Sequence, residues 1–116
     1  MDINSKLMEK GIVLPDAPPP AANYIPFVKV EKLVFISGQV SQNEQGFIKG
    51  VLGEDLNVEQ GYDAARYCAI SLLAQLKNAV NGDLNRMARV VKLGGFVNSA
   101  PSFTEQPSVI NGASDL

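Results

Sequence analysis

Residues 33–40, with the sequence LVFISGQV, form the stretch that most strongly determines the expected fold. Their apolar first half is typical of a β-strand, and a second such run, residues 25–30 (IPFVKV), ends just before it. Because only Glu31 and Lys32 separate the two runs, we predict an antiparallel hairpin of strands 25–30 and 33–40. The polar residues 41–46 then predict a loop, and residues 47–52 predict a short third strand.

A long helix is predicted after these strands, over residues 58–80. Apolar side chains recur there at steps of three and four residues, at Tyr62, Ala65, Ala69, Leu72, Leu73, Leu76 and Val80. Asn57 and Gln60 have the spacing of a capping box at the start of this helix. Asn81-Gly82 favours the left-handed conformation that ends a helix. The apolar face predicts that the helix packs against a sheet.

The remaining C-terminal sequence predicts one more strand and one more helix. Residues 89–97 are rich in apolar side chains, and the pair Gly94-Gly95 within them indicates a bulge in a strand. Residues 107–116 predict the first turns of a second helix, and the sequence ends inside that element. We therefore expect a single domain over residues 1–116 that is incomplete at its C-terminus.

The N-terminal sequence predicts an arm rather than a part of the sheet. Residues 4–10 predict a short helix, capped by Asn4 or Ser5 and ended by Gly11. Four prolines follow and favour an extended chain that cannot join an ordinary strand ladder; they are Pro15, Pro18, Pro19 and Pro20. We assign residues 1–22 to this N-terminal arm.

Composition excludes several classes of function. The 116 residues carry a net charge of -2, which provides no broad field to attract nucleic acid, and we do not expect nucleic acid as a partner. No apolar run approaches the roughly 20 residues that cross a bilayer, so we expect no membrane partner and a cytoplasmic location. The absence of histidine excludes Ser-His-Asp and Cys-His catalysis and most zinc sites. The single cysteine, Cys68, lies among apolar helix positions and is predicted to be a small core residue.

Four segments together resemble the YjgF/RidA family. They are residues 22–26 (ANYIP), residues 33–40, the helix over residues 60–76 with Ala64-Ala65-Arg66, and Gly82-Asp83-Leu84 leading into residues 89–92. The resemblance is strongest to a branch with a long N-terminal arm and a motif like residues 106–114 (QPSVINGAS). It implies an α+β, chorismate-mutase-like fold, in which a mixed β-sheet packs against two helices. It also implies a homotrimer with small-molecule clefts between subunits.

The same resemblance implies a function without a metal or an organic cofactor. Well-known relatives hydrolyse reactive imines and enamines released by pyridoxal-phosphate dehydratases, which yields a 2-keto acid and ammonia. The expected partner is accordingly a small metabolite that carries a carboxylate. An imine is already electrophilic, so gripping the carboxylate and aligning one water are sufficient for catalysis without histidine. Two alternatives stay open, a non-catalytic metabolite-binding trimer and an endoribonuclease or translation inhibitor.

The resemblance also implies four substrate-binding residues, whereas the catalytic residues stay unknown. Tyr24 is expected to close over the ligand, or else to anchor the proline-rich arm by packing. Ser37 and Gly38 are expected to present a hydroxyl and an open backbone to a carboxylate or water, or else only to end the strand. Asn111 is expected to orient substrate or water, or else to cap a helix. The family's deaminases hold the carboxylate with an arginine on a last strand, followed by a glutamate, and this sequence ends before both.

Overall fold

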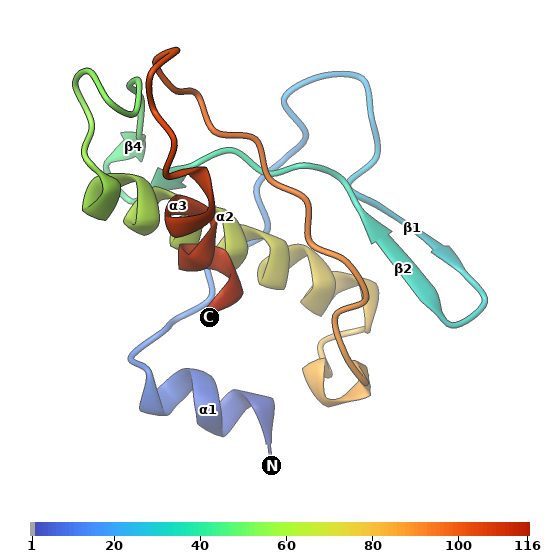
Figure 1. Ribbon diagram of the computed structural model, residues 1–116. Coiled ribbons are helices and arrows are strands. Elements are labelled where there is room, and N and C mark those ends of the chain that lie inside the picture. Colours follow the sequence, from blue (N-terminus) through green and yellow to red (C-terminus); the bar gives the residue numbers. More distant parts are fainter. Residues whose placement is uncertain (1) are drawn as a thin grey trace. The chain divides into compact units, whose positions relative to one another are not determined.

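The computed structural model describes residues 2–116, which form helices and two small sheets (Figure 1). The elements in chain order are α1 (Ile3–Glu9), β1 (Phe27–Val30), β2 (Leu33–Ile36), β3 (Gln42–Asn43), β4 (Gly46–Phe47), α2 (Val58–Ala79), the 3-10 helix η1 (Leu84–Arg86) and α3 (Gln106–Ser114). This is an α+β chain, as predicted. None of the helices within residues 2–116 is long and apolar enough to cross a membrane.

The chain divides into two compact units. The first contains the residues up to Gly38 together with Ile70–Val91, and the second contains Gln39–Ala69 and Lys92–Leu116. Helix α2 therefore contributes its C-terminal part to the first unit and its N-terminal part to the second. Because one helix is shared by both units, the assignment of residues 1–116 to a single domain stays a prediction.

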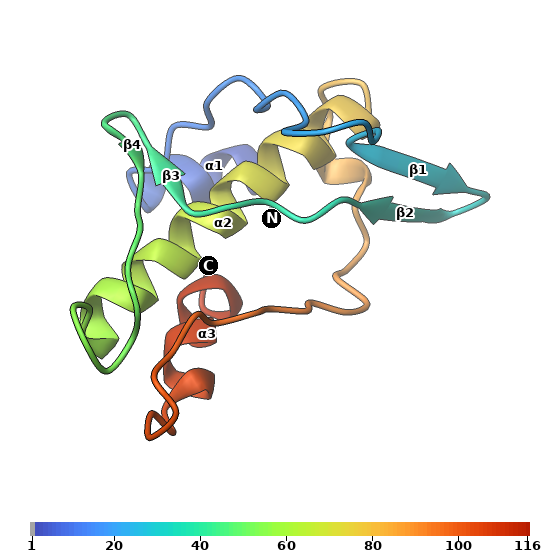
Figure 2. The ribbon, with the colours of Figure 1, turned by 90° about the horizontal axis from the view of Figure 1, so that it is seen from above.

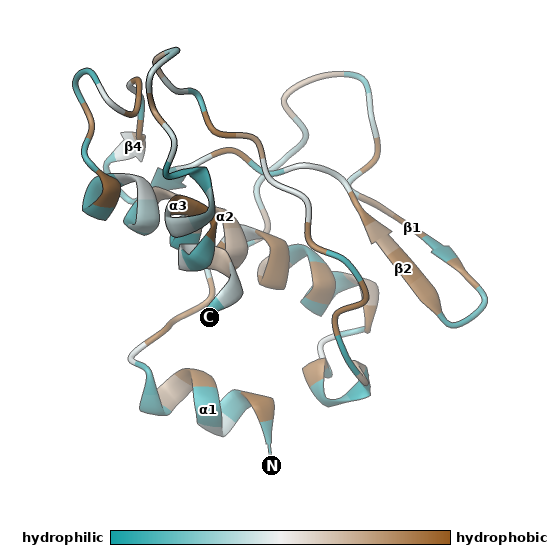
Figure 3. Ribbon diagram, in the orientation of Figure 1, coloured by the Kyte–Doolittle hydropathy of each residue, from teal (hydrophilic) through white to brown (hydrophobic). Residues whose placement is uncertain are grey.

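The hairpin of β1 and β2 is confirmed, with shorter strands than predicted (Figure 2). Val28 pairs with Phe35 and Val30 pairs with Leu33, so these four side chains share one face of the hairpin. All four are exposed, between 45% and 59%. The hydropathy colouring shows both strands as mainly apolar (Figure 3).

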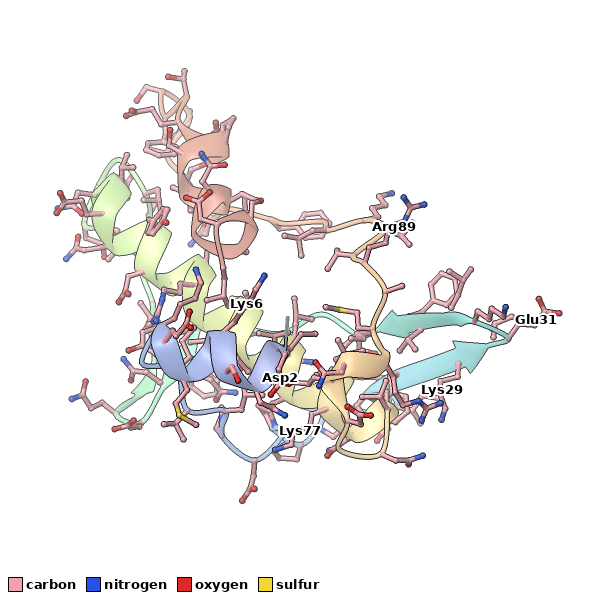
Figure 4. The ribbon with its side chains drawn as sticks, turned by 90° about the horizontal axis from the view of Figure 1, so that it is seen from below. Asp2, Lys6, Lys29, Glu31, Lys77 and Arg89 are labelled. Carbon is pink, nitrogen blue, oxygen red and sulfur yellow. The ribbon has the colours of Figure 1, made fainter. Side chains whose placement is uncertain are left out.

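The opposite face of the hairpin contacts the C-terminal end of α2 through Lys29. It carries Phe27, Val34 and Ile36, which are partly buried. Lys29 on the same face donates from its ammonium to the carbonyl oxygen of Ala79, the last residue of α2, over 3.2 Å. Lys29 thus binds one of the carbonyls that a helix end leaves without a partner. Figure 4 labels Lys29 on β1 and Glu31 at the tip of the hairpin.

Both ends of α2 have the structure that the sequence predicts. The Asn57 side chain accepts from the Gln60 amide nitrogen, and the Gln60 side chain accepts from the Asn57 amide nitrogen, each over 2.9 Å. At the other end, Asn81 and Gly82 have φ angles of 54° and 88°, and the Gly82 N–H donates to Lys77 O over 2.8 Å. The capping box and the left-handed stop are both confirmed.

The two shorter helices are also confirmed, with one wrong detail. Helix α1 is followed by Gly11 at φ 68°, as expected, but its N-cap is Asp2, whose side chain accepts from the Asn4 amide nitrogen. The predicted cap at Asn4 or Ser5 was wrong because the helix begins at Ile3. Helix α3 spans Gln106–Ser114, close to the predicted residues 107–116, with a proline in its first turn.

Each unit has its own buried residues. In the first, Leu84 is fully buried at 0% exposure, and other buried apolar side chains come from α1, α2 and their flanks: Leu7, Ile12, Ile70, Ala74, Leu76, Ala79 and Val80. In the second, Leu52, Ala65 and Val109 form a cluster that is extended by Leu56, Val97, Phe103 and Ala113. Gly112 of α3 approaches the backbone of Tyr62 in α2, which brings these two helix segments into close contact.

The predicted strand over residues 47–52 is wrong, and the predicted loop over residues 41–46 contains most of the second hairpin. Gln42 pairs with Phe47 and Asn43 with Gly46, and Gly46 has a φ of 118° that suits glycine. Leu52 makes only isolated bridges, to Leu56 and Ser99. A turn that pairs polar residues has no apolar alternation, so the sequence pattern did not reveal it.

The predicted strand over residues 89–97 is also wrong, because no strand ladder includes these residues. Four of their apolar side chains, Val90, Val91, Leu93 and Phe96, are instead exposed, from 39% at Leu93 to 103% at Phe96; Val97 is partly buried against the cluster of the second unit. The predicted mixed sheet is corrected to two separate antiparallel pairs, β1–β2 and β3–β4. The physical reason is that an apolar, β-branched run has strand propensity, whereas a ladder also requires a neighbouring edge to pair with.

Candidate functional site

The first unit joins Tyr24 to the end of β2 through the backbone of residues 25–26. The Ser37 N–H donates to the Pro26 carbonyl over 2.9 Å, and the Ser37 hydroxyl donates to the Ile25 carbonyl over 2.6 Å. These two bonds continue the hairpin by one step where Pro26 has no N–H to donate. Tyr24 directly precedes the bonded residues, so the structure places the backbone of Tyr24 next to a segment that is bonded to Ser37, the neighbour of Gly38.

Gly38 leaves one side of the backbone open. A side-chain carbon added at Gly38 would meet nothing within 4 Å. The strand has ended at Ile36, and the chain is exposed at Gly38. A flat group such as a carboxylate can therefore approach this backbone without meeting a side chain. β2 ends immediately before Ser37 and Gly38, so these residues also follow the end of the strand, which was the alternative role. Ending the strand does not conflict with ligand binding.

Tyr24 is folded back toward the proline-rich arm. Its hydroxyl oxygen accepts from the Ala21 amide nitrogen over 3.2 Å, and its own N–H donates to the Ala22 carbonyl over 2.9 Å. The side chain remains 42% exposed. A phenol that accepts one hydrogen bond still has its own O–H to donate. The ring is thus held by the arm while its hydroxyl keeps the capacity to bind a ligand.

One buried residue beside this segment was missed by the sequence analysis. Gln75 of α2 is 2% exposed, and its side-chain amide nitrogen donates to the Pro18 carbonyl over 2.8 Å. The signal was present, because Gln75 is a polar residue between the buried apolar positions Ala74 and Leu76. A buried amide requires a partner, and the nearby prolines supply carbonyls but no N–H groups.

Asn111 belongs to the second unit. It lies in the interior of α3, and its side chain is exposed. The backbone carbonyl of Asn111 accepts from the Asp115 amide nitrogen over 2.8 Å. The residue before the helix is Glu105, so Asn111 does not cap the start of α3.

A separate open hollow of about 480 Å³ lies at the start of α1 in the first unit. It is lined by Asp2, Ile3, Asn85, Met87 and Ala88, and by none of the predicted site residues. Its polar groups bind each other: the Asn85 amide donates to Asp2 over 2.7 Å and accepts from Ile3 N–H over 2.8 Å. The Asn85 hydrogen bond also lowers the pKa of the Asp2 carboxyl. We therefore interpret this hollow as part of the packing contact between α1 and η1, and not as a ligand site.

Metal and thiol chemistry have little basis in the described residues. Across residues 2–116, no three Cys, Asp or Glu side chains gather closely enough to hold a metal ion. Cys68 is partly buried in α2, and burial raises the pKa of its thiol. A thiol with a raised pKa stays protonated at neutral pH and is a poor nucleophile, which agrees with a packing role.

Comparison with known proteins gives consistent matches. Residues 4–116 match the family model described as "YjgF/chorismate_mutase-like, putative endoribonuclease". Protein TCP17 of Trypanosoma cruzi is 48% identical over 115 residues, which are 98% of this chain and 71% of that protein. Two crystal structures are also similar. A protein of unknown function from Agrobacterium tumefaciens is 44% identical with a TM-score of 0.86, over 96% of this chain and 68% of that one. A "putative endoribonuclease" from Shewanella oneidensis is 34% identical with a TM-score of 0.94, over 99% of this chain and 76% of that one.

Proposed function

Because the chain belongs to the YjgF/chorismate mutase-like family, we propose that it hydrolyses reactive imines and enamines of small carboxylic acids to 2-keto acids and ammonia. Its α+β fold is the chorismate-mutase-like fold of that family. The proposal goes beyond family membership, and it is supported by the chemistry available around Tyr24, Ser37 and Gly38.

One observation carries the proposal: two hydrogen bonds from Ser37 hold the segment that follows Tyr24 against the end of β2. Tyr24, whose phenol accepts from Ala21, therefore directly precedes a segment that is fixed next to the open backbone of Gly38. A substrate carboxylate approaches at the open backbone of Gly38, and the Tyr24 O–H donates to the same substrate. Holding the substrate and one water together in this way converts a bimolecular step into an effectively unimolecular one.

The proposed reaction needs no oxidant and no group beyond water. Water adds to the imine carbon, and one of its protons moves to the nitrogen. The remaining hydroxyl proton then moves to the same nitrogen, the carbon–nitrogen bond breaks, ammonia leaves, and the former water oxygen becomes the carbonyl of the keto acid. An enamine reaches the same path after its carbon is protonated to give the imine. The protein contributes by positioning and by exclusion of bulk water, for which histidine is not required.

The proposal includes a homotrimer with clefts between subunits, and Asn111 as a further substrate contact. The exposed apolar face of the β1–β2 hairpin supports an assembled state, because an uncovered row of four apolar side chains is typical of an interaction surface. Asn111 offers an exposed side-chain amide, which suits hydrogen bonding to a carboxylate or to water.

The test is the decay of an imine generated by a pyridoxal-phosphate dehydratase and trapped with semicarbazide. We expect the protein to accelerate the loss of the imine. Tyr24→Phe removes one donor and should lower the rate roughly tenfold, and Gly38→Val should block the open backbone. Tyr67→Phe, a tyrosine of α2 outside this segment, is the matched control and should keep the rate. No acceleration at high protein concentration would refute the proposal.

Two other functions can be distinguished from imine hydrolysis with the same protein. Binding of a 2-keto acid without any turnover, seen by calorimetry, would identify a non-catalytic metabolite-binding protein. The description of the family model and the Shewanella relative favour a ribonuclease as the second candidate. That function requires RNA binding that weakens steeply with salt, because phosphate contacts release counterions. The net charge of -2 disfavours it.

A further inference from the structure

Gln75 is an unusual residue for its position in α2. It is 2% exposed and lies between the buried residues Ala74 and Leu76, where an apolar side chain would pack without cost. Burial of a side-chain amide is tolerated only when the amide is hydrogen-bonded, and here the partner is the carbonyl of Pro18 at 2.8 Å. The hydrogen bond therefore fixes one point of the N-terminal arm to the rigid body of α2.

The arm continues from that fixed point as a stiff segment. Pro18, Pro19 and Pro20 each have a φ angle locked by the ring, and consecutive prolines form a semi-rigid extended strut. The next residue, Ala21, donates its N–H to the Tyr24 hydroxyl oxygen over 3.2 Å. Pro19, Pro20 and Ala21 are all exposed, so burial does little to hold this segment in place. Its position depends on the anchor at Pro18.

We propose that Gln75 is a positioning residue that acts through the proline strut to hold the Tyr24 hydroxyl in a fixed orientation, with its O–H directed to the substrate. The second end of the segment is held by Ser37, whose two hydrogen bonds fix Ile25 and Pro26. Tyr24 thus lies between two anchors, one on α2 and one on β2. The functional part of this inference rests on the proposed function, whereas the mechanical part does not.

The mechanical part is tested by NMR relaxation of the Ala21 and Tyr24 amides. Gln75→Met keeps the volume of the side chain and removes its donors, so the fold should be retained. Backbone order parameters should fall from about 0.85, typical of rigid backbone, to below about 0.6. The double variant Pro19→Gly and Pro20→Gly keeps the anchor but loosens the strut, and it should give the same loss of order.

Pro15→Gly is the matched control, because Pro15 is exposed and precedes the anchor. It should leave the order of Ala21 and Tyr24 unchanged. Unchanged order in the strut double variant would overturn the inference, even if Gln75→Met failed to fold. Loss of order in the Pro15 variant would also overturn it, because the arm would then be loose regardless of its anchor.

Imine hydrolysis separates this inference from the proposed function. If both hold, the strut double variant should lose roughly tenfold in kcat with a smaller change in KM, because Tyr24 is misaligned rather than absent. If the order parameters fall as expected but the unaltered protein does not hydrolyse the imine, the proposed function fails while the strut is established. If the order parameters fall and kcat is unchanged, the strut does not position a residue that takes part in the reaction.

Discussion

Gly112 is the residue at which the packing of α2 and α3 depends most directly on the absence of a side chain. A methyl group added there would overlap the Tyr62 carbonyl oxygen, which belongs to the α2 backbone and cannot rotate away. We expect Gly112→Ala to lower the free energy of unfolding by about 1–3 kcal/mol or more, as overpacking does. Thermal denaturation checks this.

Gly94→Ala is the control for that substitution. A side-chain carbon at Gly94 would meet nothing within 4 Å, and its φ is not in the left-handed region. Its unfolding free energy should stay within about 0.5 kcal/mol of the parent. Equal losses in both variants would show that the close approach of Gly112 to Tyr62 does not contribute to stability.

Tyr62 gives the second prediction at this scale, on pH dependence. Its hydroxyl donates to the Asp115 carboxylate over 2.9 Å, and this hydrogen bond raises the pKa of Tyr62 above the usual 10.0. The folded pKa is therefore higher than the unfolded one, so the stabilisation is complete below pH 10.0 and is lost as the pH rises through the folded pKa. Melting temperatures measured from neutral pH upward should fall more steeply above pH 10.0 in the parent than in Tyr62→Phe. Parallel curves would contradict it.

Among the elements, the β1–β2 hairpin contains a turn with an unsuitable residue. Glu31 has a φ of 53°, whereas Lys32 does not have a positive φ. A turn with a positive φ at its first central position favours glycine there. We expect Glu31→Gly to raise the free energy of unfolding by about 0.5–1 kcal/mol, and Lys32→Gly to lower it. A destabilised Glu31→Gly variant in chemical denaturation would show that Glu31 makes a compensating contact.

Elements with local sequence signals were predicted correctly, whereas elements that depend on a distant partner were not. Helix α2 was predicted at both ends because its signals, the capping box at Asn57 and the stop at Asn81-Gly82, are local in sequence. The strand over residues 89–97 was wrong because its pattern specifies propensity but not a pairing partner. The β3–β4 hairpin was missed because Phe47 is its single apolar side chain, so its sequence has no apolar alternation.

The candidate site shows the same division. Tyr24, Ser37 and Gly38 are predicted from the family resemblance, and no periodicity indicates them. The hydrogen bond from Ser37 to Ile25 links residues just outside the paired ends of β1 and β2, so it can be identified only when the register of the hairpin is known. Gln75 could not be assigned a role from sequence, because its partner Pro18 is far away in the chain.

For the whole molecule, the exposed apolar face of the β1–β2 hairpin allows a test of the proposed homotrimer. The hairpin face of Val28, Val30, Leu33 and Phe35 is exposed, which is costly in water for a row of apolar side chains. If the proposed homotrimer buries this face, Phe35→Glu should convert it to monomers in light scattering coupled to size-exclusion chromatography. Met8→Glu, at an exposed methionine of α1, is the control and should keep the oligomer. A parent protein that is monomeric at high concentration would contradict the proposal.

The stop that ends α2 also has a chemical consequence over time. In an Asn-Gly pair the glycine nitrogen can attack the asparagine side-chain carbonyl, which expels ammonia and forms a succinimide that water opens to aspartate or isoaspartate. In the folded chain the Gly82 N–H is engaged by Lys77 O, so this ageing reaction at Asn81 must wait for the helix end to fray.

A second Asn-Gly pair, Asn111-Gly112, provides an internal control for this reaction. It lies in the interior of α3, where Gly112 is buried. Helix ends open far more often than helix interiors, so stored protein should accumulate isoaspartate at Asn81 roughly tenfold faster than at Asn111. Peptide mapping of aged samples measures both sites at once. Equal rates would mean that both positions react only when the whole fold opens. Faster formation of isoaspartate at Asn81 would mean that its rate reports how often the end of α2 opens.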